Sequence, residues 1–562
     1  MPSLAPSSRT PLSTRLLCGL ALACSLAPTA IARAAERQVL LVAAADSYAD
    51  LKRQLSWIGP QIDNPGLAAM FESLLMLSTQ GRGLAGLDVK RPLGIVVTSD
   101  GSDLAAHGFV PVKDLDKLLT SLQGVIGPTK RDGDARRIAL PSGLALAITE
   151  HDGWAVIGQA ARDDSPAPSA GDPTPLVTKV AADYTLGIEA YPSRMSAEVL
   201  RKLEAALDQA AAASAAQGQP MDPAAFKAVL RSLGQTESLA LGLGIDDAAG
   251  EVFVENRSVA VPGSTSAAAS AAAATGTLTV GMPASAADEP PAIRGYVAQS
   301  IPEAARAEFL AALDQTLPRD ADDPITRTVS RLVRDLLAAA LSAGGIDAAL
   351  AVDTTAATKE RPLPAVTAGV RVQDGAALER QVKQAFGTNA AIPGVKTSFD
   401  VGKAGAATLH RVSIDVADDA LAERIGDALD LTLAVAPNYA LVLAGGDVAK
   451  RTEAALAASG RPVADAAPIA GLEAAAAPLL EYAGSVAAIA PATNGAAAAR
   501  AATSALVDLR VRPIERGFAT RLSIDAGVLK AAAALAAPER PVGPGGVPLP
   551  EVPPGFPIPL PR

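Results

Sequence analysis

Short apolar runs separated by polar turns recur along the chain and predict β-strands. The clearest case is a hairpin. Leu144, Leu146 and Ile148 alternate along one strand, Asp152-Gly153 turns the chain, and residues 154–157 return. The other runs that predict strands in the first half are residues 38–42, 93–98, 108–112, 184–188, 239–245 and 252–259.

Apolar residues at helical spacing separate several of these strands. Asp46-Ser47 offers a helix cap, and Leu51, Leu55 and Ile58 then repeat with the helical period. Because many of the links between strands are short, the strands are expected to pair antiparallel. The pattern therefore predicts an α+β fold.

The order of predicted elements returns about 260 residues later. The match is best where VPVKD at residues 110–114 corresponds to VRVQD at 370–374, each before a helix. A helix near residues 420–425 is an insertion in the second copy. The predicted strands of the second half are residues 294–298, 348–352, 366–372, 431–435, 439–443, 485–489, 506–511 and 519–524. We therefore expect an internal duplication, with two related halves that each contain an antiparallel sheet and packed helices.

Composition places the boundaries of these halves. The first α+β half covers residues 38–260 and the second covers 291–530. Between them, residues 261–290 are rich in alanine, glycine, serine and proline and are expected to form a linker. Residues 538–562 are dense in proline and glycine and predict a disordered tail without regular structure.

Residues 1–34 have the features of a bacterial secretory signal peptide. Arg9 and Arg15 make its beginning positive, residues 16–27 form a mostly apolar run, and Ala32-Arg33-Ala34 supplies small residues for cleavage. The apolar run is shorter than the roughly 20 residues that span a bilayer. A buried helix that begins the fold is the alternative. We therefore predict an exported, envelope-associated protein, periplasmic or extracellular, with no transmembrane segment in the mature chain.

Both cysteines, Cys18 and Cys24, lie within this segment. Cleavage after Ala34 would leave no thiol, which excludes disulfides, zinc–thiolate sites, iron–sulfur clusters and cysteine nucleophiles. Residues 21–24, with the sequence ALAC, loosely resemble a lipobox in which leucine and alanine have exchanged places. A lipoprotein anchored through Cys24 is therefore an alternative prediction.

The charge balance argues against nucleic-acid binding. The chain has 49 basic and 59 acidic residues, a formal net charge of −10. Loss of Arg9, Arg15 and Arg33 with the signal would leave 46 basic residues and a net charge of −13. Such an acidic chain, with scattered lysines and arginines, lacks the basic patch that nucleic-acid binders carry.

The sequence lacks the usual motifs of catalysis and metal binding. His107, His151 and His410 are spaced too far apart to form a metal motif on one element, and no HExxH, GxSxG or phosphate-loop motif occurs. The GxGxxG at residues 81–86 follows a predicted helix instead of a strand, which favours a helix end over a dinucleotide site. Paired carboxylates, such as Asp246-Asp247, fit turns and helix caps. We therefore predict no cofactor and no metal, and the catalytic residues, if there are any, stay unknown.

Three segments of the first half carry a resemblance to a known family. Residues 91–97 (RPLGIVV), 108–115 (GFVPVKDL) and 152–156 (DGWAV) resemble segments of a family of large exported planctomycete proteins. The similarity runs through most of residues 38–530 and is weakest in the alanine-rich second half. The resemblance implies export and an α+β fold. The family is uncharacterised, so it supplies no functional residue.

The main functional hypothesis is a non-enzymatic binding or scaffolding protein of the cell envelope, with an envelope protein as its partner. One alternative is an exported hydrolase whose site is assembled from distant residues, with His107 and His151 as its candidates. The other alternative is the lipoprotein anchored through Cys24.

Overall fold

The computed structural model describes eleven main stretches of the chain and three further residues. These are residues 37–139, 145–159, 172–216, 233–281, 291–316, 324–355, 357–358, 362–387, 394–416, 422, 426–460, 469–485 and 492–536. The predicted signal peptide at 1–34 and the tail at 538–562 lie outside the described residues, as does most of the predicted helix at 420–425.

The described strands form one sheet of 20 strands, in which every pair of neighbours is antiparallel. Those of the first half are β1 (Gln38–Ala45), β2 (Leu93–Ser99), β3 (Leu104–Pro111), β4 (Lys130–Asp132), β5 (Ala135–Ala139), β6 (Ala145–His151), β7 (Trp154–Gln159), β8 (Leu186–Ala190), β9 (Thr236–Asp246) and β10 (Glu251–Ala260). Those of the second half are β11 (Ile293–Ser300), β12 (Gly345–Asp353), β13 (Ala365–Arg371), β14 (Val395–Ala404), β15 (Ala407–Asp415), β16 (Ala428–Val435), β17 (Tyr439–Ala444), β18 (Ala470–Ala475), β19 (Leu506–Ile514) and β20 (Gly517–Asp525). The prediction of an antiparallel α+β fold is confirmed.

The strand order is the same in both halves. The first half runs β4–β5–β6–β7–β3–β2–β1–β8–β9–β10 across the sheet. The second runs β14–β15–β16–β17–β13–β12–β11–β18–β19–β20. The two halves meet where β10 pairs with β20, from Glu251 opposite Asp525 to Val259 opposite Gly517. The sheet is thus continuous, whereas the sequence predicted a separate sheet in each half.

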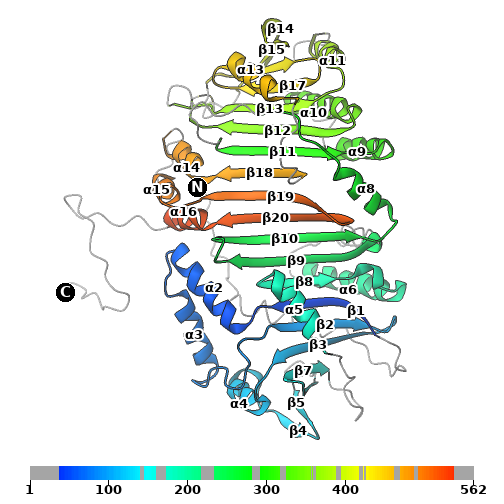
Figure 1. The fold of residues 1–562 in the computed structure, drawn as a ribbon, viewed down its shortest axis with the longest axis vertical. Coiled ribbons are helices and arrows are strands. Elements are labelled where there is room, and N and C mark those ends of the chain that lie inside the picture. Colours follow the sequence, from blue (N-terminus) through cyan, green and yellow to red (C-terminus); the bar gives the residue numbers. More distant parts are fainter. Residues whose placement is uncertain are drawn as a thin grey trace, which may run out of the picture.

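The helices occupy equivalent places between these strands. In the first half they are α2 (Tyr48–Gln61), α3 (Leu67–Ser78), α4 (Leu115–Ile126), α5 (Thr174–Asp183), α6 (Ala197–Ala216) and α8 (Thr265–Ala273). In the second half they are α9 (Glu303–Thr316), α10 (Pro324–Ser342), α11 (Gly375–Gly387), α13 (Val448–Ala458), α14 (Ala476–Ser485), α15 (Ala492–Arg500) and α16 (Ala526–Ala536). In Figure 1 the strands are stacked along the long axis of the molecule. Helices α2, α3 and α14–α16 lie at the left ends of the strands, and α8–α10 lie at the right.

Local sequence signals explain several of these elements. Ser47 caps α2 by accepting a hydrogen bond from the backbone N–H of Asp50, as its position predicted. The hairpin of β6 and β7 turns at Asp152 and Gly153, whose φ angles of 48° and 73° suit a type I′ turn. Helix α4 buries Leu115, Leu118 and Leu119 on one face.

Two predictions require correction. Residues 261–290 were expected to form a linker, but they contain α8, which is capped by Ser264 and buries Ala273. The strand expected at 485–489 is wrong at its start, because Ser485 ends helix α14, and residues 486–489 lie outside the described residues. The strand in the equivalent place is β18, where the sequence AGLEAA is poor in strand-forming residues and gives no β signal.

Helices cover the two faces of the sheet at different places. Helix α5 packs Val177 and Val180 against Val42, Val96 and other residues on one face of the first half. Helix α13 covers the same face in the second half. On the opposite face, α4 packs over the β3–β7 region and α11 packs over β13, β16 and β17. Ten strands lie between the regions that α4 and α11 cover, and the central six are β8, β9, β10, β20, β19 and β18.

Candidate functional site

A broad apolar surface lies on the face of the sheet that α4 and α11 cover at its two ends. It is formed by β8, β9, β10, β20, β19 and β18, and we call it the open sheet face. Cross-strand partners such as Leu243 and Val254, or Leu509 and Leu522, place its side chains on one side. Its members are Leu186, Ile188, Ala190, Leu239, Leu241, Leu243, Ile245, Val252, Val254, Asn256, Ser258, Ala470, Leu472, Ala474, Val507, Leu509, Val511, Phe518, Thr520, Leu522 and Ile524.

The large side chains of this face are unusually exposed. Leu186, Ile188, Leu241, Val254, Leu472 and Leu522 have between 37% and 52% of their surface exposed. Most of the other members are half-buried. An antiparallel sheet normally buries its apolar face against a second layer. Among the described residues, no such layer buries these six side chains.

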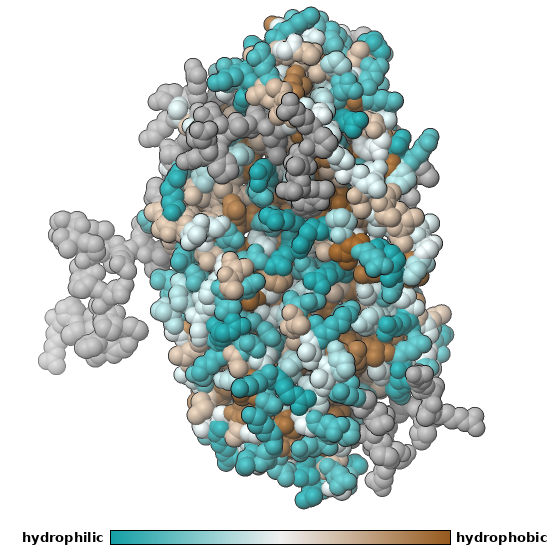
Figure 2. All heavy atoms as spheres, in the orientation of Figure 1, coloured by the Kyte–Doolittle hydropathy of each residue, from teal (hydrophilic) through white to brown (hydrophobic). Residues whose placement is uncertain are grey.

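Charge is segregated onto the other face of the same strands. None of the residues of the open sheet face is charged. The charged residues that point to the opposite side are Glu189, Glu251, Glu255, Arg257, Glu473, Asp508, Arg510, Arg512, Arg521 and Asp525. In the view of Figure 2, hydrophilic residues are spread along the molecule and hydrophobic residues form small patches. In these strands, therefore, the charged side chains lie on one face, and no layer of the described residues covers the apolar face.

Glu255 is the centre of an ionic network on the charged face, where the two halves join. Its side chain is 1% exposed and accepts hydrogen bonds from the Tyr184 hydroxyl (3.1 Å) and the Arg257 guanidinium. Arg512 and Arg521, from the second half, lie 3.8 and 3.9 Å from its other carboxylate oxygen. Burial, together with Glu255, raises the pKa of Tyr184. Charge-assisted bonds of this kind compensate the desolvation of a buried carboxylate, so the network fits a role in joining the halves.

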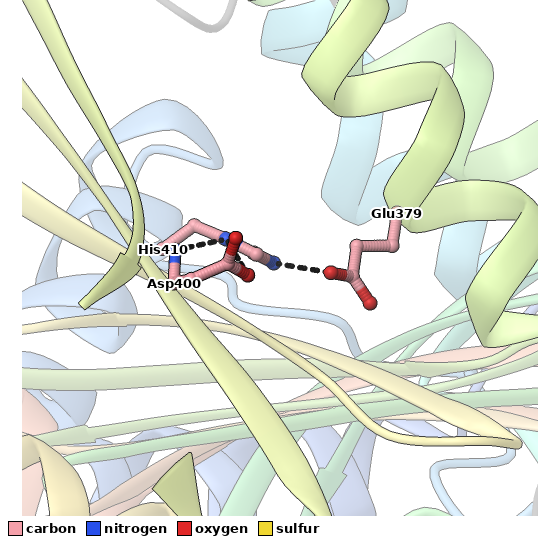
Figure 3. A group of neighbouring side chains, drawn as sticks. All are labelled: Glu379, Asp400 and His410. Atoms are coloured by element: carbon pink, nitrogen blue, oxygen red, sulfur yellow. Dashed lines mark hydrogen bonds and ion pairs between the residues drawn. The ribbon is translucent and has the colours of Figure 1, made fainter. Parts of the chain in front are cut away.

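A second cluster of polar side chains lies near the far end of the second half (Figure 3). His410, on β15, is 1% exposed, and its Nδ1 accepts a hydrogen bond of 3.1 Å from the backbone N–H of Asp400. Its Nε2 lies 3.7 Å from Oε1 of Glu379, on α11, and has no hydrogen-bond partner. Asp400 sits where the β14–β15 register shifts, with a φ of 54°.

The charges around His410 favour an ion-pair cluster over a metal site. The ligand atoms of Glu379, Asp400 and His410 lie within 4.8 Å of one another, which is close enough for one cation. However, the Lys383 ammonium already binds Glu379 at 2.7 Å and both oxygens of Asp400 at 2.9 Å. Nδ1 of His410 accepts the hydrogen bond from the Asp400 N–H and therefore carries no proton. The proton of the neutral imidazole is thus on Nε2, the atom that faces Glu379. A metal there would have to displace both the lysine and this proton.

The two histidines of the hydrolase hypothesis are not brought together. His107, on β3, is 7% exposed and packs beside Phe109, with ring centroids 6.5 Å apart. His151 ends β6 on the solvent-exposed hairpin, 3.1 Å from the neighbouring Asp152 carboxylate. The two side chains share no hydrogen bond, ion pair or ring contact in the described residues. Burial lowers the pKa of His107, and the charge of Arg37 adds to this effect.

The other sequence candidates have structural roles. The GxGxxG at 81–86 begins at the end of α3, where the N–H of Gly81 bonds to the carbonyl of Met76, and leads into a turn. Asp246 begins the β9–β10 turn and accepts hydrogen bonds from the N–H groups of Ala248 and Ala249. The predicted helix end at Gly81 and the predicted turn at Asp246 are therefore confirmed.

Sequence reasoning missed the open sheet face. Residues 239–245, in which Leu239, Leu241, Leu243 and Ile245 alternate with glycine and alanine, were predicted only as a strand. That signal could not show that six such strands adjoin, because the pairing of β10 with β20 joins residues about 270 positions apart. It also could not show which helices would cover them.

Comparisons with known proteins give no further guide. No protein-family model, no curated protein and no solved structure matches the chain. Among the described helices, none is both long and apolar enough to cross a bilayer.

Proposed function

We propose that this chain is an exported, non-enzymatic binding or scaffolding protein of the cell envelope, and that the open sheet face is its interaction surface. The observation that carries the proposal is an uncharged, half-exposed apolar face on six adjacent strands. Monomeric soluble proteins rarely expose continuous apolar patches larger than a few hundred Å², and larger patches mark sites of interaction. Export and the envelope location rest on residues 1–34 of the sequence alone.

The energetics support association at this face. Burying a leucine, isoleucine or valine side chain completely contributes about 1.5–3 kcal/mol. The six most exposed members are roughly half exposed, so covering each would contribute on the order of 1 kcal/mol. Because this face carries no charge, covering it does not require a charged group to lose its hydration. This gain supports a binding role for the open sheet face.

We also propose that the two halves arose by internal duplication. Ten strands in the same spatial order, with helices at equivalent points between them, support this origin. The two copies pair through equivalent strands, β10 and β20, so that the open sheet face takes three strands from each copy. If so, an experimental structure should superpose residues 38–258 on 290–530, and failure to superpose would refute the duplication.

Site-specific photo-crosslinking in cells tests the interaction surface. A photo-reactive amino acid replaces Leu241, which is 52% exposed on the open sheet face, or Val125, which is 54% exposed on α4. We expect the probe at 241 to give a discrete protein adduct after irradiation, because a partner covers this face, and the matched probe at 125 to give none. Equal crosslinking at both positions, or none at 241, would contradict the proposal.

A further inference from the structure

The open sheet face is a flat surface more than an enclosed cavity. Its most exposed side chains, from Ile188 on β8 to Leu472 on β18, come from five of the six strands and have similar exposed fractions. A ligand pocket instead surrounds most of the ligand and leaves its own lining little exposed. The shape therefore fits a broad partner, such as the face of another sheet, better than a small molecule.

Its size fits a stable protein interface. The half-buried apolar residues of β1 and β11, such as Ala43 and Val297, continue the face on both sides. Eight strands at a spacing of about 4.8 Å, each contributing about seven residues, give a footprint of roughly 38 by 22 Å. This is about 800 Å², close to the area that each partner buries in a standard interface.

The chemistry of the face favours a second copy of the same chain. A face without charges needs no complementary charges opposite it, so it can pack on an identical face. It also has an approximate two-fold arrangement, because β9 and β8 flank β10 in the way that β19 and β18 flank β20. Two-fold dimers use the same patch on both subunits. An anionic membrane surface is a poorer fit, since the face has no cations and the chain carries a net charge of −10.

We propose that two copies of the chain stack through their open sheet faces, with the β10–β20 strands near the centre, to form a face-to-face dimer. Two apolar sheet faces pack about 10 Å apart, with their side chains interdigitated. This inference rests on the proposed role of the open sheet face as an interaction surface, and adds the identity of the partner.

Sedimentation velocity of the purified chain over a concentration series tests the dimer. We expect the wild type to sediment at twice the mass of the chain and Val254→Asp at the monomer mass, with dimer affinity reduced at least 100-fold. Val254 is 44% exposed, so the charge remains hydrated in the monomer. The matched control, Val125→Asp on α4, should remain a dimer. Circular dichroism establishes that each variant is folded, and Leu472→Asp replaces Val254→Asp if the latter does not fold.

The outcomes separate this inference from the function on which it rests. A wild type that stays monomeric, or a folded Val254→Asp variant that stays dimeric, overturns the dimer. If the wild type is monomeric while the probe at 241 still captures a different protein in cells, the open sheet face is an interaction surface but its partner is not a second copy. If the monomer instead floats with vesicles of phosphatidylcholine and phosphatidylglycerol, the dimer is also wrong and the face meets lipid.

Discussion

At the scale of single residues, the described structure keeps several ionisable side chains away from water. Glu255 lies among three arginines and Tyr184. The pKa of His410 is lowered by burial and by the charge of Lys383, against the opposite effects of Glu379 and Asp400. A histidine that is buried in its neutral form binds a proton more readily once the chain unfolds. The stability of the fold therefore depends on pH through His410.

We expect the free energy of unfolding to fall as the pH drops below about 6.5, because His410 binds a proton more readily in the unfolded chain than in the folded protein. Its pKa is lower in the folded protein than its ordinary value near 6.5, so its contribution to stability is present above that pH and is lost as the pH falls. The slope for one such group is at most about 1.4 kcal/mol per pH unit. Denaturant unfolding at pH 7.5, 6.5 and 5.5 should show a smaller loss in His410→Gln, which keeps a hydrogen-bond acceptor but does not titrate.

The exposed hairpin histidine provides the control for this measurement. His151 is exposed on its turn, so His151→Gln should retain the wild-type pH dependence. An unchanged slope in His410→Gln would show that burial of this imidazole does not contribute to the acid sensitivity.

At the scale of elements, strand β9 shows how small residues permit the packing of large ones. A Cβ atom at Gly242 would overlap the Tyr184 ring, and one at Gly244 would overlap the Phe253 ring. Both rings lie on the charged face, so the glycines allow aromatic side chains to rest against the backbone of β9. Both glycines lie within residues 239–245, which the sequence predicted as a strand.

We expect Gly244→Ala to lower the free energy of unfolding by about 1–3 kcal/mol, because Phe253 has to move within a packed core. Gly234 is a control in which a Cβ meets nothing within 4 Å, and Gly234→Ala should stay within about 0.5 kcal/mol of the wild type. Chemical denaturation of both variants measures the difference. Equal stabilities would mean that Phe253 does not pack against β9 as described.

Individual helices and strands also show how much of the fold could be predicted from the sequence. The β6–β7 hairpin, helix α4 and strands β9 and β10 have strong local signals, and the sequence predicted all of them. Strand β18 has almost no such signal, because alanine, glycine and glutamate are poor strand formers, and its place was missed. Helix α8 was mistaken for a linker because an alanine- and serine-rich stretch resembles flexible chain until it is packed.

At the scale of the whole molecule, the decisive features are non-local. The pairing of β10 with β20 joins the two halves into one sheet and creates the open sheet face. No local pattern indicates such a pairing, so the sequence analysis predicted two separate sheets and no interaction surface. The His410 cluster was missed for the same reason, since Glu379, Asp400 and His410 come from α11, β14 and β15.

Cysteine labelling in the native envelope tests the central claim most directly, because a partner must cover the open sheet face there. The only cysteines of the chain are Cys18 and Cys24, so Cys18→Ser and Cys24→Ser give a thiol-free background for one introduced cysteine. We predict that Leu241→Cys reacts with a maleimide at least tenfold more slowly than Val125→Cys, although both positions are about equally exposed in the isolated chain. Equal reaction rates at 241 and 125 would contradict the account, because the open sheet face would then be bare in its native setting.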